Sequence, residues 1–491
     1  MYSFHNFMLP FQWSIQGYDD RMFSEQVGLR NIHCVDMSNW ERVTCPEDSA
    51  EKNDLYNERN YFFDFVHNAL YDTGREDTLL WHFERKETRA GRVSYVIDCG
   101  SKVYELKVKA INLNLFSTGV GVLSFHLGND RYPDLEDVLH INQVGRRIYP
   151  PFIASLDKKE NGHRAVIAES IQIKGLDGDA NDYREDFTRY TSDMEHDSLF
   201  ASFVTALIHD VADNLTLRPV VDDRMFVQCW YKNDQLTAGY MGDGYKRFID
   251  SDEWYEFVFA DEKGWKNCYD PEMQHKLISE ATYPRWRQKG SLYGITRNTM
   301  MFLTGTGAST HLFETFETIY ARMAELVLVQ KASVLRFSTE INHISKMDEK
   351  KGFGDKVSSL YKEYIRFVNQ IHFREISPQD MGRDLYKMFY DTINLEKHVE
   401  KLDDEIEELY NYVSLSEDRK NNKTLGVLTW FATIAVPMTV VAGIFGMNNT
   451  ALTGTSDAWY NHIWPQIFLI LGITGVVFII AVLLLKNKGA R

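Results

Sequence analysis

Short apolar runs alternate with polar turns along residues 1–305, and this pattern indicates a soluble domain of mixed strands and helices. Runs rich in β-branched and aromatic residues predict strands, whereas apolar residues at three- and four-residue spacing predict helices. The predicted strands are Val93–Asp98, Tyr104–Phe116, Val120–Gly128, Arg224–Lys232 and Glu253–Asp261, and the predicted helices are Asp134–Gly145 and Leu199–Ala212. We therefore expect an α/β domain over residues 1–305.

The pattern then becomes helical, and two paired helices are predicted within residues 306–376. The first begins at Ser309 or Thr310, either of which can cap a helix, and apolar residues recur every three or four positions after it. The segment Lys351–Asp355 has the sequence KGFGD, and its two glycines end this helix. A second helix is predicted over Lys356–Phe373.

A third helix carries the most regular periodicity, and we expect it to form a stalk over residues 377–424. It begins within Ser377–Asp380, where Pro378 suits a first helical turn. The apolar seam that follows has the alternating steps of a coiled coil. Its members are Leu385, Met388, Thr392, Leu395, Val399, Leu402, Ile406, Leu409 and Val413. We expect this helix to continue unbroken into the membrane, so that from Gln379 to Phe445 it would measure on the order of 100 Å at 1.5 Å per residue.

Two uncharged apolar stretches, Leu425–Phe445 and Ile463–Leu485, lie near the end of the chain. Each is long enough to cross a bilayer, which takes about 20 apolar residues. A charge at mid-membrane costs roughly 2.5–3.5 kcal/mol on insertion scales, and neither stretch carries one. We predict a first transmembrane helix over residues 425–448 and a second over 463–485.

Basic residues flank the outer ends of these two predicted spans, and the loop between them has none. Those residues are Arg419, Lys420, Lys423, Lys486, Lys488 and Arg491. By the positive-inside rule, both termini are cytoplasmic, and the loop of residues 449–462 lies on the other side of the membrane. Residues 486–491 then form a basic cytoplasmic tail.

Composition narrows the classes of function. The chain has 491 residues and a formal net charge of −16, and an acidic surface argues against a nucleic-acid binder. Its five cysteines show no CxxC spacing, which favours a reduced compartment without a disulfide framework. Because no spacing indicates a nucleophile with its base, the sequence makes no case for an enzyme.

One face of the first predicted span consists of small, aliphatic and hydroxyl residues. Stepping by three and four from Asn422 gives Leu425, Thr429, Ala432, Val436, Thr439, Gly443 and Gly446. Two spans from one copy cannot enclose a pore, so a pore would need several copies of this helix around an axis. The same face would also suit ordinary helix packing in lipid.

The stripe ends at Gly446-Met447-Asn448. Gly446 permits a close approach or a helix stop. A ring of Asn448 side-chain carbonyls would suit a hydrated divalent ion such as Mg²⁺, which sheds its water reluctantly. Without its context, the tripeptide is equally compatible with a helix C-cap.

The surrounding segment, SEDRKNNKTLGVLTWFATIAVPMTVVAGIFGMNN, resembles the CorA-type two-span magnesium channel family. The family pattern has an Asn-containing basic juncture, a Pro and a Thr inside the first span, and Gly-Met-Asn at its end. Asn422, Pro437, Thr439, Gly443 and the Gly446–Asn448 motif fall in register with it. The resemblance covers residues 377–491 by motif and the two preceding helices by arrangement.

The resemblance implies a homopentamer in the inner (plasma) membrane, with a funnel-shaped stalk, first spans lining the pore and second spans outside them. Gly446, Met447 and Asn448 would form the outer ion site. Pore-lining and gate positions would be Asn422, Leu425, Leu428, Thr429, Ala432, Val436, Thr439 and Gly443. Leu425 and Leu428 would form a hydrophobic constriction that gates by dewetting. In the family, cytosolic Mg²⁺ bound between protomers closes the pore, but the sequence does not locate that site.

One departure from the family pattern leaves alternatives open. The loop NTALTGTSDAWYNH has Asp457 as its only acidic residue, so the ring that attracts cations is thinned. The function indicated is Mg²⁺ influx down its electrochemical gradient. A Zn²⁺, Co²⁺ or Ni²⁺ transporter of the same fold, with or without proton coupling, stays open, as does a membrane-anchored sensor or scaffold with a degenerate pore.

Overall fold

The structure is a computed structural model, and it separates into two compact units, Met1–Glu407 and Glu408–Arg491. The residues described are 1–446 without 20, 26–27, 36, 46–57, 149–166, 177–182, 190–199, 222–223, 242–247 and 348–351, together with Gly472 and Gly475. Met447, Asn448, Asp457 and nearly all of the predicted second span therefore lie outside the described residues.

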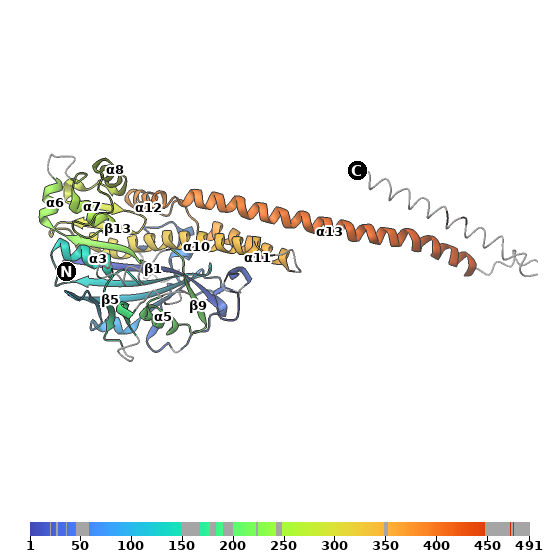
Figure 1. Cartoon of the computed structure of the whole chain (residues 1–491), viewed down its shortest axis with the longest axis horizontal. Coiled ribbons are helices and arrows are strands. Elements are labelled where there is room, and N and C mark those ends of the chain that lie inside the picture. Colours follow the sequence, from blue (N-terminus) through green and yellow to red (C-terminus); the bar gives the residue numbers. More distant parts are fainter. Residues whose placement is uncertain are drawn as a thin grey trace, which may run out of the picture. The chain divides into compact units, whose positions relative to one another are not determined.

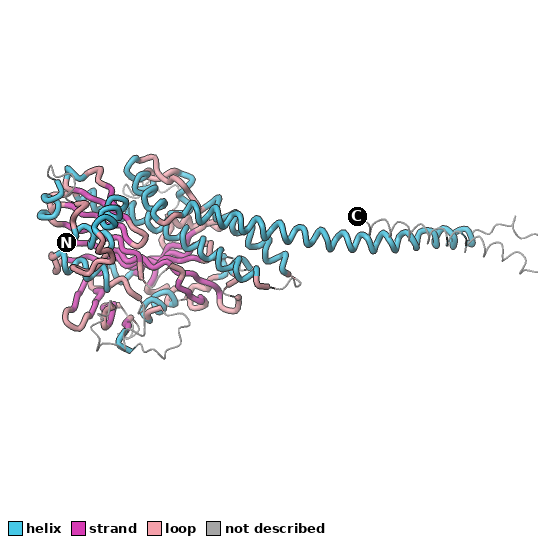
Figure 2. The backbone as a smooth tube through the Cα atoms, turned by 45° about the horizontal axis from the view of Figure 1, so that its top comes forward, coloured by secondary structure: helices cyan, strands magenta, loops and turns pink. Residues whose placement is uncertain are grey.

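A single mixed sheet of 13 strands forms the centre of the first unit (Figure 2). Its main path runs β11-β12-β13-β10-β1-β6-β5-β4-β7-β8, and only β10 and β13 pair in parallel among these neighbours. The strands are β1 (Ser3–Ile15), β2 (Trp40–Arg42), β3 (Leu80–Arg85), β4 (Ser94–Asp98), β5 (Val103–Phe116), β6 (Val120–Asn129), β7 (Ser170–Lys174), β8 (Arg184–Asp186), β9 (Leu215–Pro219), β10 (Phe226–Lys232), β11 (Thr282–Tyr283), β12 (Ser291–Ile295) and β13 (Thr299–Thr304). The predicted strands near residues 94, 103, 120 and 226 are confirmed.

Helices cover both faces of this sheet. The helices of the described residues are α2 (His67–Leu70), α3 (Leu135–Val144), α5 (Ser202–His209), α6 (Asp234–Met241), α7 (Asp252–Phe259), α8 (Pro271–Ala281), α9 (Thr310–Thr315), α10 (Ala321–Ser345), α11 (Phe353–Gln370), α12 (Asp380–Thr392) and α13 (Leu395–Gly446). A π-helical turn, Phe316–Tyr320, joins α9 to α10. Ser309 caps α9 by accepting a hydrogen bond from the His311 amide, so the predicted helix start is confirmed.

The sheet lies between helices, with α10 on one side and α5 on the other (Figure 1), and α3 shares the apolar core of the α5 face. Successive side chains of β1 point to opposite faces of the sheet, so alternate residues belong to different layers. Phe7, Leu9 and Phe11 join the main apolar core, which includes residues of α3 and α5. This arrangement confirms an α/β domain followed by long helices.

The strand predicted over Glu253–Asp261 is wrong, because the structure has helix α7 there. Its aromatic residues had suggested a strand, but a helix cap precedes them. The Ser251 hydroxyl accepts from the Trp254 amide at 3.2 Å, which satisfies one of the free donors of the first turn. Trp254, Phe257 and Val258 then fall on one buried helical face.

The single unbroken stalk predicted from Gln379 to Phe445 is also wrong. Helix α12 ends at Thr392, and α13 begins at Leu395. Between them, Asn394 has a φ of 53°, a left-handed conformation that Asn tolerates better than most residues. The three- and four-residue spacing continues across this break, so periodicity alone does not reveal it.

Within the first unit, the apolar seam of the stalk is already buried in a single copy of the chain. Leu385, Leu395 and Leu402 are buried there, as are Val399 and Ile406. The Tyr364 hydroxyl of α11 donates to the Val399 carbonyl at 3.5 Å, which places α11 beside this part of α13. The seam therefore packs on helices of its own chain.

A buried histidine makes the stability of this domain sensitive to acid. The His5 ring is fully buried beneath α3, and its Nδ1 lies 2.6 Å from Asn142 Oδ1. Burial lowers the pKa of His5 to about 4, against an ordinary value of 6.5, although the Asn142 hydrogen bond raises it in part. Between these values the unfolded chain binds a proton that the folded chain does not, so stability is full above pH 6.5 and declines as the pH falls toward 4.

We expect the free energy of unfolding to fall by up to about 1.4 kcal/mol per pH unit through His5 alone over this window. Urea unfolding of the full chain in detergent, followed by tryptophan fluorescence at about pH 7 and pH 5, measures it. Between those two pH values, the free energy of unfolding of His5→Gln should fall by roughly 2 kcal/mol less than that of the parent protein. Equal losses in the two proteins would contradict the assignment.

Candidate ion pathway on the C-terminal helix

Helix α13 carries the pore positions that the sequence predicts. Six of the gate and pore-lining residues, from Asn422 to Val436, are exposed in one copy, and so is Thr439. The main positions follow one another at three- and four-residue steps, so they share one face of the continuous helix. Gly443 and Gly446 belong to the same helix, whereas Met447, Asn448 and Asp457 lie outside the described residues.

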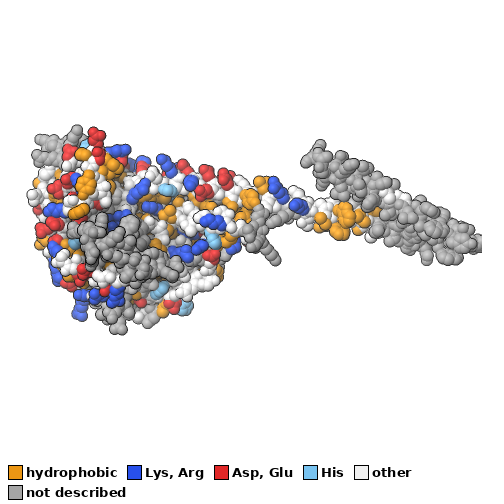
Figure 3. Space-filling model, in the orientation of Figure 1, with side chains coloured by type: hydrophobic (Ala, Val, Ile, Leu, Met, Phe, Trp, Pro, Cys, Tyr) orange, Lys and Arg blue, Asp and Glu red, His pale blue; other side chains and the backbone are white. Residues whose placement is uncertain are grey.

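Large apolar side chains are exposed around the whole circumference of this part of α13. On the predicted pore face, Leu425 and Leu428 are 60% and 63% exposed, and on the opposite face Val427 is 55% exposed. Trp430 and Phe431 are exposed as well, and Figure 3 shows the resulting apolar cluster on this stretch of α13. An apolar helix surface of this kind needs a cover, either lipid or other helices.

The threonine hydroxyls of this segment donate hydrogen bonds to backbone carbonyls of the same helix. Thr429 Oγ1 donates to the Leu425 carbonyl at 2.7 Å, and Thr433 Oγ1 donates to the Thr429 carbonyl at 2.6 Å. Thr439 Oγ1 lies 2.8 Å from the Val436 carbonyl and 3.0 Å from that of Ala435. With its hydrogen occupied, each hydroxyl oxygen keeps lone pairs that accept from water or face a cation.

Pro437 lies inside α13, and the helix continues through it. Proline has no amide hydrogen, so the carbonyl one turn earlier loses its helical partner. Among the residues that the structure describes, no helix meets the combined length and apolarity needed to cross a membrane.

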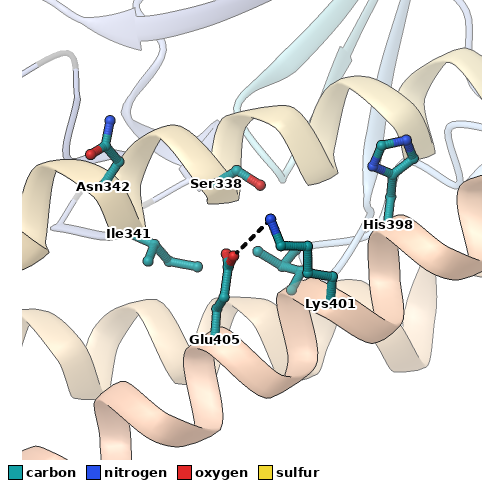
Figure 4. A pocket seen from close by; sticks show the side chains of 7 residues that line it. Ser338, Ile341, Asn342, His398, Lys401 and Glu405 are labelled. Carbon is teal, nitrogen blue, oxygen red and sulfur yellow. Dashed lines mark ion pairs between the residues drawn. The ribbon is translucent and has the colours of Figure 1, made fainter.

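The acidic run Asp403–Glu408 begins at a shallow groove between α10 and α13 (Figure 4). Ser338, Ile341 and Asn342 line it from α10, and the α13 side carries His398 and Lys401. Lys401 Nζ lies 3.3 Å from Glu405 Oε1, so this acid is already paired. Within the described part of the chain, no group of three His, Cys, Asp or Glu side chains is placed to hold a metal ion.

Comparison with known proteins finds a family that the C-terminal part of the chain resembles. The family model of the CorA-like Mg²⁺ transporter protein matches residues 308–485, which includes α9 to α13. This part of the chain is therefore similar to the CorA-like family. The resemblance stated from the Gly-Met-Asn segment is thereby confirmed at the level of the family.

A curated relative supports the same CorA-like assignment. The chain is 32% identical to the cobalt/magnesium transport protein CorA of Thermotoga maritima over 124 residues, which is 25% of this chain. The matched region covers 32% of the length of that relative. The N-terminal α/β domain and the long helices agree with a cytoplasmic domain and stalk of the CorA-like kind.

Sequence reasoning missed a second group of polar residues, which lie beneath α10 in the first unit and are buried or half-buried there. Asn112 and Asn114 alternate with apolar residues along β5, and His82 and Glu84 do the same along β3. Alternation alone predicts a solvated strand face. The alternation of polar and apolar residues along the long strand β5 could have indicated this group. That its polar face is covered depends on α10, which no local pattern predicts.

Proposed function

We propose that this protein is a homopentameric channel of the inner membrane that admits divalent cations, with Mg²⁺ as its main ion. Five copies of α13 would meet about a common axis, and the Gly446–Asn448 motif would stand at the outer entrance. Its role would be transport down the electrochemical gradient without enzymatic chemistry. Both termini would be cytoplasmic.

The exposed apolar surface of α13 is the observation that carries this proposal. Leaving a Leu or Val side chain in water rather than burying it forgoes about 1.5–3 kcal/mol, and α13 exposes several in succession. Lipid can cover Val427, Trp430 and Phe431. The face with Thr429, Ala432 and Thr439 has smaller or hydroxyl side chains, which favour close approach around an axis.

The proposed selectivity depends on neutral oxygen ligands. Mg²⁺ holds its water shell tightly, so a ring of Asn448 amide oxygens would bind the hydrated ion through its water molecules. Asp457 would add the only acidic charge of the outer loop. A weakly charged entrance of this kind would pass ions slowly, and it leaves transport of Zn²⁺, Co²⁺ or Ni²⁺ as the second candidate.

Uptake of each metal into liposomes that contain the purified full-length protein, at a fixed membrane potential, tests the proposal. We expect Mg²⁺ uptake, and we expect Asn448→Ala to reduce it at least tenfold, which corresponds to about 1.4 kcal/mol of barrier. Asn449→Ala is the matched control, because it removes the neighbouring amide outside the motif. It should leave uptake within about twofold of the parent, since twofold is only about 0.4 kcal/mol.

The other outcomes separate the rival functions. Uptake of Zn²⁺, Co²⁺ or Ni²⁺ without Mg²⁺ would establish the second candidate. No uptake of any metal by the parent, despite correct insertion, would favour a membrane-anchored sensor or scaffold. Native mass spectrometry of the same preparation reports whether five copies assemble.

A further inference from the structure

A polar layer lies buried between the central sheet and α10, on the face away from the main apolar core. Strand pairing assembles it from distant segments. Asn6 on β1 lies opposite His126 on β6, and Asn112 on β5 lies opposite both Ser124 on β6 and Glu84 on β3. Burying polar groups costs free energy unless each finds a partner, so the layer calls for groups that complete its hydrogen bonds.

This layer lines a partly open cavity of about 180 Å³, and the π-helical turn and α10 line it opposite the sheet. Arg322 and Glu325 of α10 line it, and Glu317 lines it from the turn. Asn114 Nδ2 donates to the Glu325 carboxylate and ties β5 to the helix. Every lining residue belongs to the unit Met1–Glu407, so the cavity is separate from the candidate ion pathway on α13.

Glu325 differs from the other carboxylates that line the cavity. Those three have cationic partners: Glu58 pairs with Arg322, Glu84 with Arg89, and Glu317 with Lys109. Among the described residues, Glu325 makes no ion pair. Burial raises the pKa of Glu325, and the Asn114 hydrogen bond and the nearby Arg322 and His82 offset this only in part.

Two buried amide oxygens of the cavity wall also lack partners. Asn6 is fully buried, and its Nδ2 donates to Gln228 Oε1 at 3.0 Å. Gln228 Nε2 in turn donates to the Phe316 carbonyl at 2.6 Å, which fixes the orientation of both amides. Asn6 Oδ1 therefore remains as an acceptor. Asn112 Nδ2 lies 3.5 Å from His126 Nε2, and among the described residues neither Asn6 Oδ1 nor Asn112 Oδ1 has a hydrogen-bond donor.

The free groups of the cavity thus include a carboxylate and two amide oxygens, which are all acceptors. We propose that this cavity binds a hydrated divalent cation, held through its water molecules by Glu325, Asn6 and Asn112. A hexahydrated cation presents only hydrogen-bond donors, which match these acceptors. The cavity of about 180 Å³ has room for several water molecules, because one water needs at least about 10–15 Å³ of such space.

Two observations favour a hydrated ion over one bound directly. No three His, Cys, Asp or Glu side chains converge to replace the water shell within the part of the chain that the structure describes. Amide oxygens are weak competitors for the water of Mg²⁺ but good acceptors for its hydrogens. The proposal takes the class of ion from the proposed function, but binding here does not require a working pore.

Thermal unfolding of the full-length Asn448→Ala protein in detergent tests the site without the outer pore motif. A ligand that binds only the folded state raises the unfolding temperature as its concentration exceeds Kd. We expect MgCl₂ to raise it more than KCl at equal ionic strength. We expect hexaamminecobalt(III), a donor-only complex that does not exchange its ligands, to act at least as well as MgCl₂.

Glu325→Gln, added to that background, removes the charge and keeps the shape of the side chain. We expect it to need at least tenfold more MgCl₂ for the same shift, whereas Glu314→Gln, an exposed neighbour outside the cavity, should match the background protein. An unchanged response in Glu325→Gln would overturn the proposal, and so would a shift with a small diammonium ion but none with MgCl₂.

Anomalous scattering from bound hexaamminecobalt(III) would place the ion in the cavity, while water alone there would refute the proposal. Because binding is measured in a protein without the pore motif, failure of transport and failure of this site give different results.

Discussion

Leu428→Asp channels in liposomes are expected to leak divalent cations under conditions that keep the parent closed. Leu425 and Leu428 are the large apolar side chains at the start of the proposed pore, and both are more than half exposed in a single copy. Around an axis they would form a narrow apolar ring that excludes water. Five carboxylates would wet this ring and attract cations, so resting Mg²⁺ uptake should rise about tenfold or more, a change of about 1.4 kcal/mol in barrier.

Val427→Asp provides the matched control for this prediction. Val427 is one residue away and almost equally exposed, but it lies on the opposite face of α13. An aspartate there should leave resting uptake near the parent value if the faces are assigned correctly. Equal leaks in both variants, or no leak in Leu428→Asp, would count against the gate.

Glu340→Ala is expected to cause the largest loss of stability, because it leaves a buried guanidinium without its counter-ion. Arg336 and Glu340 lie one turn apart on α10, each 1% exposed, with Arg336 Nη1 2.7 Å from Glu340 Oε2. Arg336 Nε and Nη2 have no hydrogen-bond partner among the described residues, and the group stacks 3.8 Å from the centre of the Phe337 ring. Breaking a buried ion pair from one side typically costs 3–5 kcal/mol, so we expect a loss of about that size in urea unfolding.

The exposed pair Lys387–Asp391 supplies a control with the same four-residue spacing. Its two side chains are mostly exposed, and their charged atoms lie 2.8 Å apart. Asp391→Ala should cost about 0.5 kcal/mol or less, because solvent screens the pair. The double change Arg336→Met with Glu340→Leu should recover much of the loss, since apolar residues of similar size remove both charges. A small effect of Glu340→Ala would mean that water reaches this pair.

The common helix face of the residues proposed for the ion pathway follows from the sequence alone. Spacing along one helix places Leu425, Thr429, Ala432 and Val436 on a common face, and the structure has them on one continuous helix. Neighbours three and four apart in a helix share a face whatever the rest of the molecule does. The two uncharged stretches and the Gly446–Asn448 motif are likewise local patterns, so the family followed from them directly.

Local patterns failed where two structures suit the same residues. The aromatic run after Ser251 is compatible with a buried strand or a buried helix, and the Ser251 cap with the surrounding core decided for α7. The break at Asn394 is equally hidden, because the apolar spacing of α12 and α13 is the same on both sides of it. In each case, packing against the rest of the first unit selected one of two local choices.

The sequence by itself determined the α/β class of the first domain, the long helices, the uncharged stretches and the shared helix face of the residues proposed for the ion pathway, because each depends on neighbours along the chain. Only the tertiary structure decided that the seam of α12 and α13 is covered by the same chain, and that Asn6, Asn112 and Glu325 share one cavity. Those three residues come from β1, β5 and α10 and meet through strand pairing and helix packing. Long-range pairing of this kind leaves no periodic trace in any one segment, which is why the polar cavity emerges only from the folded molecule.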